Sequence, residues 1–205
     1  MTTESPVEAT ALFHGAASAY VGLVAAIPAE AYVRPALGVW TVRDLIGHTG
    51  RALVTVTTYL GKPAEREIVS SATDYYLKVG EVDSAAVAER GKQAGAALGD
   101  DPATAVRQQY ADATAALDGI DDDPLIETIA GGIRVSSYLP TRTTELTVHG
   151  LDLAAATGVD WQPSAAVLTH VAQLLAEIAV RKGDGPTVLR ALTGRAPLPA
   201  GYCLL

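Results

Sequence analysis

Apolar residues recur at helical spacing over most of this chain, and proline and glycine interrupt the pattern at intervals. A repeat of this kind predicts amphipathic helices joined by short turns. Ser5 and Pro6 open the first repeat with the residue types that helices prefer at the N-cap and the first helical position. The predicted helices span residues 6–27, 42–60, 84–98, 103–117 and 163–181, and another runs from a cap at Ser136 or Ser137 to just before Gly158.

The second predicted helix has a well-marked start. Thr41 and Asp44 form a variant capping box, in which each side chain bonds to a backbone N–H group of the other residue. Trp40 precedes the cap, at the position where an apolar residue packs against the first turns. Gly61 follows the last apolar position, as expected of a C′ residue. This helix carries His48.

Other parts of the chain depart from the helical pattern. Residues 126–135 are rich in β-branched side chains around Gly131-Gly132, which predicts a hairpin with these two glycines in its turn. Residues 62–80 carry neither pattern and read mostly as loop. The tail, residues 183–205, holds several glycines and prolines and is expected to add a strand or two. The pattern as a whole predicts a helical bundle with a minor β element.

Composition supports a helical core and narrows the range of partners. Hydrophobic residues make up 49% of the 205 residues and aromatic residues only 5%, so much of the apolar content is alanine, which favours closely packed helices. The net charge of -8 argues against nucleic acid and against an anionic membrane surface as partners. The single cysteine, Cys203, cannot form an intramolecular disulfide. We find no signal-peptide pattern and expect no membrane-spanning run, which predicts a cytoplasmic protein.

Glu145 and His149 are the first candidates for chemistry. They lie four residues apart, so on a helix their side chains share one face and can bind one divalent metal ion. His48 supplies a third ligand if the two helices pack side by side. Three protein ligands leave a coordination position open, as in catalytic zinc sites. The alternative is a surface pair between Glu145 and either Arg142 or His149.

Two further carboxylates stand near the predicted ligands along the chain. Asp44 precedes His48 by one helical turn, and Asp152 follows His149 by three residues. Either carboxylate would fix the orientation of a ligating imidazole by accepting a hydrogen bond from it. Capping of the helix is the alternative role for Asp44, and a solvent-exposed acid is the alternative for Asp152.

Two segments resemble the signature stretches of a known family. Residues 40–48 read WTVRDLIGH and residues 142–154 read RTTELTVHGLDLA. Both are similar to the paired motifs of the mycothiol-dependent maleylpyruvate isomerase family, and the tail at residues 189–199 is similar to the close of many such proteins. The resemblance runs from the first helix to about Gly158. It implies a DinB-like metal-binding four-helix bundle.

The resemblance also implies a domain organisation and a set of ligands. We expect a mainly α fold, with the DinB-like bundle and a short β-hairpin in residues 1–158 and a small C-terminal helix/strand extension, residues 159–205, packed on the bundle. Zinc would be bound by three side chains, His48, Glu145 and His149, with water or a thiol cosubstrate such as mycothiol in the remaining positions. The family's larger C-terminal domain supplies an essential arginine, for which Arg195 is the candidate here.

These ligands suggest thiol chemistry. Zinc lowers the pKa of a bound thiol below its free value of about 8.5, so the thiolate forms at neutral pH. We therefore expect a zinc-dependent enzyme that directs a mycothiol-like thiol to an electrophilic small molecule, as an isomerase or a thiol S-transferase. Arg142 and Arg195 are the candidate catalytic residues, and either of them or Arg134 would hold acidic groups.

Two other functions are compatible with the same residues. Zinc-bound water would give a hydrolase. A structural or sensory metal would give a non-catalytic metal-binding bundle. We expect a monomer or a homodimer in each case.

Overall fold

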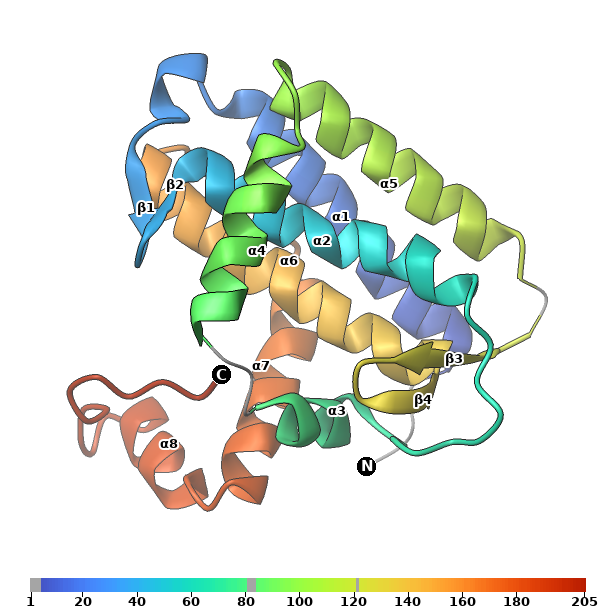
Figure 1. Cartoon of the computed structure of the whole chain (residues 1–205). Coiled ribbons are helices and arrows are strands. Elements are labelled where there is room, and N and C mark those ends of the chain that lie inside the picture. The colour runs from blue at the N-terminus through green and yellow to red at the C-terminus, as the bar shows by residue number, and fades with distance from the viewer. Residues whose placement is uncertain (1–4, 81–83, 121) are drawn as a thin grey trace.

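The body of the protein is a bundle of four long helices (Figure 1). The computed structural model describes residues 5–80, 84–120 and 122–205. The four helices are Pro6–Ala26 (α1), Val42–Leu60 (α2), Pro102–Asp118 (α5) and Val135–Thr157 (α6). Around the bundle, α1 packs on α6, α6 on α2, α2 on α5, and α5 on α1. The mainly α fold expected from the sequence is confirmed.

Smaller elements surround this bundle. Four further helices are Ala72–Val79 (α3), Ser84–Ala96 (α4), Ala165–Arg181 (α7) and Gly185–Leu192 (α8), and a short 3-10 turn spans Ala29–Ala31. Two antiparallel pairs of strands join Pro35–Leu37 (β1) to Trp40–Thr41 (β2) and Leu125–Thr128 (β3) to Gly131–Arg134 (β4). The helix α4 crosses α2, α7 packs on α1, α3 and α6, and α8 packs on α7 (Figure 1). The division into domains at residue 158 stays a prediction.

The core of the bundle is filled from its four helices. Tyr20 on α1 is fully buried, and its hydroxyl donates a hydrogen bond of 2.7 Å to the backbone oxygen of Ile46 on α2. Other aliphatic and aromatic side chains with almost no exposed surface belong to the same core, among them Phe13, Leu23, Leu45, Leu53, Tyr138, Leu139, Leu146 and Leu153. Burial of such side chains is the main favourable contribution to folding.

The helix α1 corrects one expectation. It has 21 residues and contains an 18-residue stretch with a mean hydropathy of 1.4, so by length and composition alone it is apolar enough to span a membrane. From the sequence, we expected no run long enough to span a membrane. In the structure α1 is one of the four helices of the bundle: it packs against α5 and α6 and contributes Phe13, Tyr20 and Leu23 to the core.

Glycines let α2 and α4 pack in close contact. A Cβ atom on Gly47 would lie 2.2 Å from the backbone nitrogen of Gly95, and one on Gly95 would lie 2.8 Å from the Cα of Asp44. The indole N–H of Trp40 donates to the backbone oxygen of Ala88 on α4 at 2.9 Å. This close crossing, which agrees with the packing expected from the composition, places α4 next to the turn of α2 that carries His48.

The start of α2 follows the sequence closely. The Thr41 side chain accepts from the backbone N–H of Asp44, and the Asp44 carboxylate accepts from the backbone N–H of Thr41, which completes the capping box. At the other end, Gly61 is the C-cap with a φ of -78°, so the left-handed C′ conformation expected there is not formed.

The hairpin forms, but its turn differs from the expected one. Thr128 pairs with Gly131, so the turn consists of Ile129 and Ala130 and not of the two glycines. Gly132 instead allows the backbone near Arg66 to pack directly against this strand, since a Cβ on Gly132 would lie 2.0 Å from the backbone oxygen of Arg66. The same Gly132 accepts backbone hydrogen bonds from residues 68 and 69.

Three other expectations need correction. The stretch read as loop contains α3, which Ser71 caps by accepting from the backbone N–H of Asp74. Helix α6 begins at Val135, before either predicted serine cap, because Ser136 instead bonds to the Asp123 carboxylate. The C-terminal tail forms α8, and the described residues 183–205 contain no strand.

Candidate metal centre

The structure brings together the three side chains that the sequence singled out. His48 lies on α2, and Glu145 and His149 lie one turn apart on α6, the helix packed beside it. One ligand atom from each residue can be chosen so that all three lie within 4.8 Å of one another, and all three residues are half-buried. The rings of His48 and His149 are 5.0 Å apart between centroids.

His149 is held by two carboxylates. Its Nε2 lies 3.5 Å from Oε2 of Glu145, and its Nδ1 lies 3.1 Å from Oδ2 of Asp152. Burial alone would lower the pKa of His149, but the hydrogen bonds to Asp152 and Glu145 outweigh it and raise the pKa to about 9. In the protein without metal, the imidazole is therefore protonated at neutral pH.

Glu145 is the matching anion. Burial would raise the pKa of this carboxyl group, but the hydrogen bond to His149 and the charge of Arg142 outweigh it and lower the pKa to about 2. The hydroxyl of Tyr76 on α3 donates to Oε1 of Glu145 at 3.1 Å and lies equally far from the backbone oxygen of Thr141. Glu145 thus has a fixed position and a full negative charge.

His48 has a different environment. Its ring lies 4.3 Å from the indole of Trp40 between centroids, at an interplanar angle of 32°. Burial and then the neighbouring charge of His149 lower the pKa of His48 to about 4, so its imidazole is neutral. The Nδ1 atom of His48 is buried and finds no hydrogen-bond partner among the described residues. A neutral imidazole is the form that binds a metal.

The two supporting carboxylates have different roles. Asp44 completes the capping box and bonds to both the backbone N–H and the hydroxyl of Thr41, so the capping role is confirmed. Asp152 contacts the ring nitrogen of His149 that faces away from Glu145. That is the arrangement in which an outer carboxylate orients a ligating histidine.

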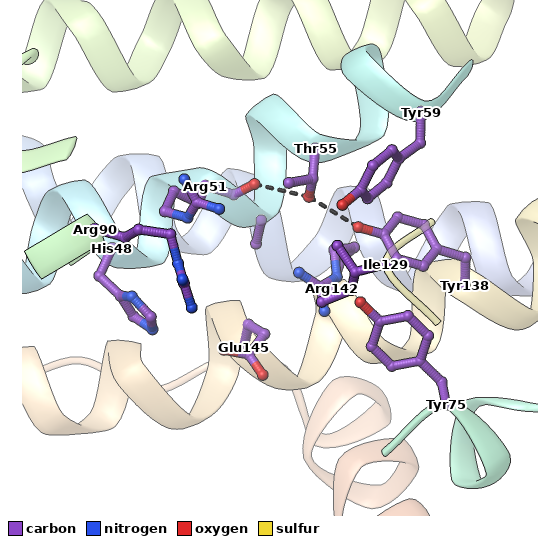
Figure 2. Close-up of a pocket in the computed structure, with 11 residues that line it drawn as sticks. His48, Arg51, Thr55, Tyr59, Tyr75, Arg90, Ile129, Tyr138, Arg142 and Glu145 are labelled. Atoms are coloured by element: carbon purple, nitrogen blue, oxygen red, sulfur yellow. Dashed lines mark hydrogen bonds between the residues drawn. The ribbon is translucent and has the colours of Figure 1, made fainter. Parts of the chain in front are cut away.

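A cavity of about 300 Å³ opens beside His48 and Glu145 (Figure 2). Its polar lining is rich in arginine and tyrosine: Arg51, Arg90, Arg142, Tyr59, Tyr75 and Tyr138. Glu145 is the one acidic residue among the described residues that line it. Three arginines around one cavity give it a positive local charge in a chain whose net charge is -8, and a positive cavity suits an anionic ligand.

Arg142 faces this cavity between aromatic rings. Its guanidinium carbon lies 4.9 Å from the ring centroid of Tyr138 and 5.7 Å from that of Tyr75. Burial would lower its pKa, but the Tyr138 hydroxyl and Glu145 outweigh it, so the pKa is raised and the group stays cationic. Within the described part of the chain, Arg142 forms no ion pair with Glu145 inside 4.0 Å, so the structural pair considered as an alternative is not formed.

The other arginines named from the sequence lie elsewhere. Arg195 follows α8, is exposed and donates to the backbone oxygen of Thr193, and it does not line the cavity. Arg134 is also exposed, pairs with Glu67 at 3.6 Å and does not line the cavity.

Several residues of the site were not named from the sequence. Arg51 follows His48 by three residues on α2, so helical spacing was a usable signal for it. Arg90 reaches the cavity because α4 crosses α2, and Tyr75 and Tyr76 lie on the helix that was read as loop. For these three residues the sequence offered no local signal.

Known proteins resemble this chain in sequence and in fold. A family model described as "Mycothiol maleylpyruvate isomerase N-terminal domain" matches residues 5–154, the range that holds all three clustered side chains. A solved structure, "Crystal structure of the mycothiol-dependent maleylpyruvate isomerase", is similar with a TM-score of 0.59 and 18% identity, over 86% of this chain and 71% of that chain. At this identity the structural likeness speaks for the fold alone. No curated protein sequence matches the chain.

Proposed function

Because the chain belongs to the family of mycothiol maleylpyruvate isomerase N-terminal domains, we propose that it is a metal-dependent, thiol-using isomerase of an unsaturated acidic molecule. The observation that carries this proposal is the cluster of His48, Glu145 and His149 beside an arginine-lined cavity. The cluster offers a place for a cation that activates a thiol, and the arginines offer a place for the acidic substrate.

The three clustered side chains fit zinc. Two imidazoles and a carboxylate are ligand types that zinc prefers, and three protein ligands leave a position for an incoming group. The buried Nδ1 of His48, which has no partner among the described residues, is an orphaned polar atom of the kind that an ion accounts for. When bound, such a cation lowers the pKa of a thiol in the open position, so that the thiolate exists at neutral pH.

The residues of this chain would prepare that cation site and the substrate. His149 releases its proton to solvent before it can act as a ligand, while Asp152 keeps its ring in place. The Tyr76 hydroxyl holds one oxygen of Glu145. Arg51, Arg90 and Arg142 orient the acidic groups of the substrate and offset their charge.

The proposed reaction conserves atoms and electrons. The thiolate sulfur forms a bond to one alkene carbon, and the electron pair of the double bond moves onto the conjugated carbonyl oxygen. The former double bond is now single and rotates. The electron pair then returns, the carbon–sulfur bond breaks and the thiolate leaves, so the cis substrate becomes the trans product. The arginines of the cavity would stabilise the negative charge on the oxygen as it develops.

The test combines metal analysis with a panel of thiols. Full-length protein purified without chelator is assayed for metal, then for conversion of maleylpyruvate with mycothiol, glutathione, cysteine or no thiol. We expect about one zinc per chain and turnover that requires a thiol. Cys203→Ser should keep this activity, because Cys203 is exposed and remote in sequence from the cluster.

The mass of the product separates the candidate reactions. An unchanged mass supports the isomerase, and a mass increased by one thiol would identify a thiol S-transferase. Cleavage into two products whose summed mass exceeds that of the substrate by one water, without need for a thiol, would identify a zinc hydrolase. Metal far below one per chain together with no thiol-dependent turnover would overturn the proposal.

A further inference from the structure

The cavity has a second end, lined by tyrosine. Tyr59 lies eleven residues after His48 on α2, and Tyr138 lies seven residues before Glu145 on α6. At a rise of about 1.5 Å per residue, the backbone positions of these tyrosines lie roughly 10 Å or more along the helices from those of His48 and Glu145. The rings of Tyr59 and Tyr75 lie 5.6 and 5.7 Å from the ring of Tyr138, and in Figure 2 the hydroxyl groups of the three gather on the side where Arg142 lies.

Tyr138 has a structural role in this group. Its hydroxyl donates to Oγ1 of Thr55 at 2.9 Å, and the Thr55 hydroxyl in turn donates to the backbone oxygen of Arg51 at 2.8 Å. This chain of hydrogen bonds fixes the ring against which the Arg142 guanidinium stacks at 4.9 Å. Tyr138 therefore positions the Arg142 guanidinium, and its own hydroxyl has no proton left to donate to a ligand.

The remaining donors at this end have no partner in the protein. Among the described residues, no acceptor bonds to the hydroxyl of Tyr59 or to that of Tyr75. Arg142 uses its Nε to donate to Oγ1 of Thr141 at 3.0 Å, and both of its terminal nitrogens are without an acceptor in the same part of the chain. Burial raises the pKa of Tyr75, so its hydroxyl keeps its proton and remains a donor.

These donors share one requirement. The guanidinium fork of Arg142 offers N–H donors and the positive charge, and the two phenol hydroxyls offer O–H donors. A carboxylate matches them, since its two oxygens accept the fork of Arg142 side by side and keep lone pairs for two hydroxyls. A phosphate dianion carries two charges, and the second cation near this end, Lys62, whose Nζ lies 5.7 Å from the centroid of the Tyr59 ring, is not among the residues that line the cavity.

We propose that Arg142, Tyr59 and Tyr75 form a carboxylate-binding subsite that anchors one acidic group of the second substrate. Its link to catalysis rests on the proposed function, but the subsite itself needs no metal. Arg142 precedes Glu145 by three residues on α6, so these two backbone positions are about one helical turn apart, and the subsite lies on the side of Glu145 away from His149. The subsite would thereby select substrates by the separation between the acidic group and the reacting carbon.

The subsite is tested on the full chain after removal of metal with chelator. Binding of succinate is measured by calorimetry beside succinamide, which has the same length but no charge, and beside inorganic phosphate. We expect succinate to bind and succinamide to bind at least about tenfold more weakly. Phosphate that binds as well as succinate would overturn the assignment to a carboxylate.

Variants then locate the bound carboxylate. We expect Tyr59→Phe and Tyr75→Phe each to weaken succinate about tenfold, the size of a hydrogen bond to a charged group, and Arg142→Gln to abolish binding. Arg142→Lys should also bind weakly, because a point charge does not replace the planar fork. Tyr110→Phe and Arg107→Gln, outside the cavity, serve as controls.

The outcomes separate the subsite from the proposed function. If the variants weaken succinate binding as expected but the protein shows no thiol-dependent turnover, the subsite is supported and the proposed isomerase activity is overturned. Thiol-dependent turnover with succinate affinity unchanged in Tyr59→Phe and Tyr75→Phe overturns the subsite. Should Arg142→Gln not fold, these two phenylalanine variants still decide the question, because each removes only one hydroxyl.

Discussion

The two ends of the cavity use the same two helices, α2 and α6, but the ligands that we propose for them, a metal ion and a carboxylate, have opposite charge. At the metal end the charges are already paired, with His149 in contact with Glu145 and Asp152. At the tyrosine end, Arg142 has no carboxylate within 4.0 Å among the described residues. A metal ion at the first end must therefore displace the proton of His149. An anion at the second end can bind the unpaired donors of Arg142 and the tyrosines without displacing a proton. The ends should differ in how binding depends on pH.

The strongest test of this comparison removes a metal ligand. Glu145→Ala takes away the one anionic member of the cluster formed with His48 and His149. We expect zinc affinity to fall roughly 10³-fold, since zinc sites with four protein ligands bind with about 10–16 kcal/mol in total and one ligand is a large share of this. Thiol-dependent turnover should be lost with the metal. Competition with a chromophoric chelator measures the affinity.

The same variant should leave the other end intact. Succinate binding to metal-free Glu145→Ala should stay equal to wild type or become tighter, because a neighbouring negative charge has gone. Loss of succinate binding in this variant, with an unchanged melting temperature, would show that the two ends do not act separately.

The next largest effect is that of pH on zinc binding. The pKa of His149 in the metal-free protein is raised to about 9, so below this pH each unit of acidification lowers the share of free imidazole about tenfold. Zinc affinity should rise about 100-fold between pH 6.5 and 8.5, with close to one proton released per ion. Calorimetry in buffers of different ionisation enthalpy counts the protons. If zinc affinity did not change with pH over this range, His149 would not be protonated and paired with Glu145 and Asp152 as described.

The pKa shifts of His149 and Glu145 also predict how the stability of the metal-free protein depends on pH. The raised pKa of His149 contributes stability that is complete below its ordinary value of 6.5 and is lost as pH rises through about 9. The lowered pKa of Glu145 contributes stability that is present above its ordinary value of 4.5 and is lost as pH falls through about 2. From this pair alone, the free energy of unfolding should be greatest between pH 4.5 and 6.5. Denaturant unfolding at several pH values measures it.

The clustering of His48, Glu145 and His149 could be predicted from the sequence because its geometry is local. Glu145 and His149 share a helix face by spacing alone, and one pairing of helices brings in His48. The capping box at Thr41 and the glycine that ends α6 are local signals too, and both are present in the structure.

The tyrosine end depends on contacts that spacing does not encode. Tyr75 comes from α3, a helix of eight residues whose stretch looked like loop. Arg90, which lies beside His48 in Figure 2, likewise depends on a tertiary contact, the crossing of α2 and α4 that Gly47 and Gly95 allow. The glycines of the hairpin were assigned to a turn, but they allow the backbone near Arg66 to pass. In each case a tertiary contact decided the local structure.

A smaller effect should come from Asp152. In Asp152→Asn the group beside Nδ1 of His149 loses its charge but keeps its size, so the ring is held less firmly and its basicity falls. We expect zinc affinity to drop about 10–100-fold, the usual range for an outer residue of a metal site. The fold should be unchanged, as should succinate binding. Asp160→Asn, which lies outside the cluster, is the matched control.

The smallest and sharpest test uses two neighbours on α3, because Tyr75 and Tyr76 serve opposite ends. The Tyr76 hydroxyl has one proton, which goes to the Glu145 carboxylate in preference to the backbone oxygen of Thr141, since an anion is the stronger acceptor. We expect Tyr76→Phe to weaken zinc about three- to tenfold, as for one hydrogen bond, and to leave succinate binding unchanged. Tyr75→Phe should weaken succinate and leave zinc unchanged. If either variant alters both ligands to the same extent, the two ends form a single site and the comparison fails.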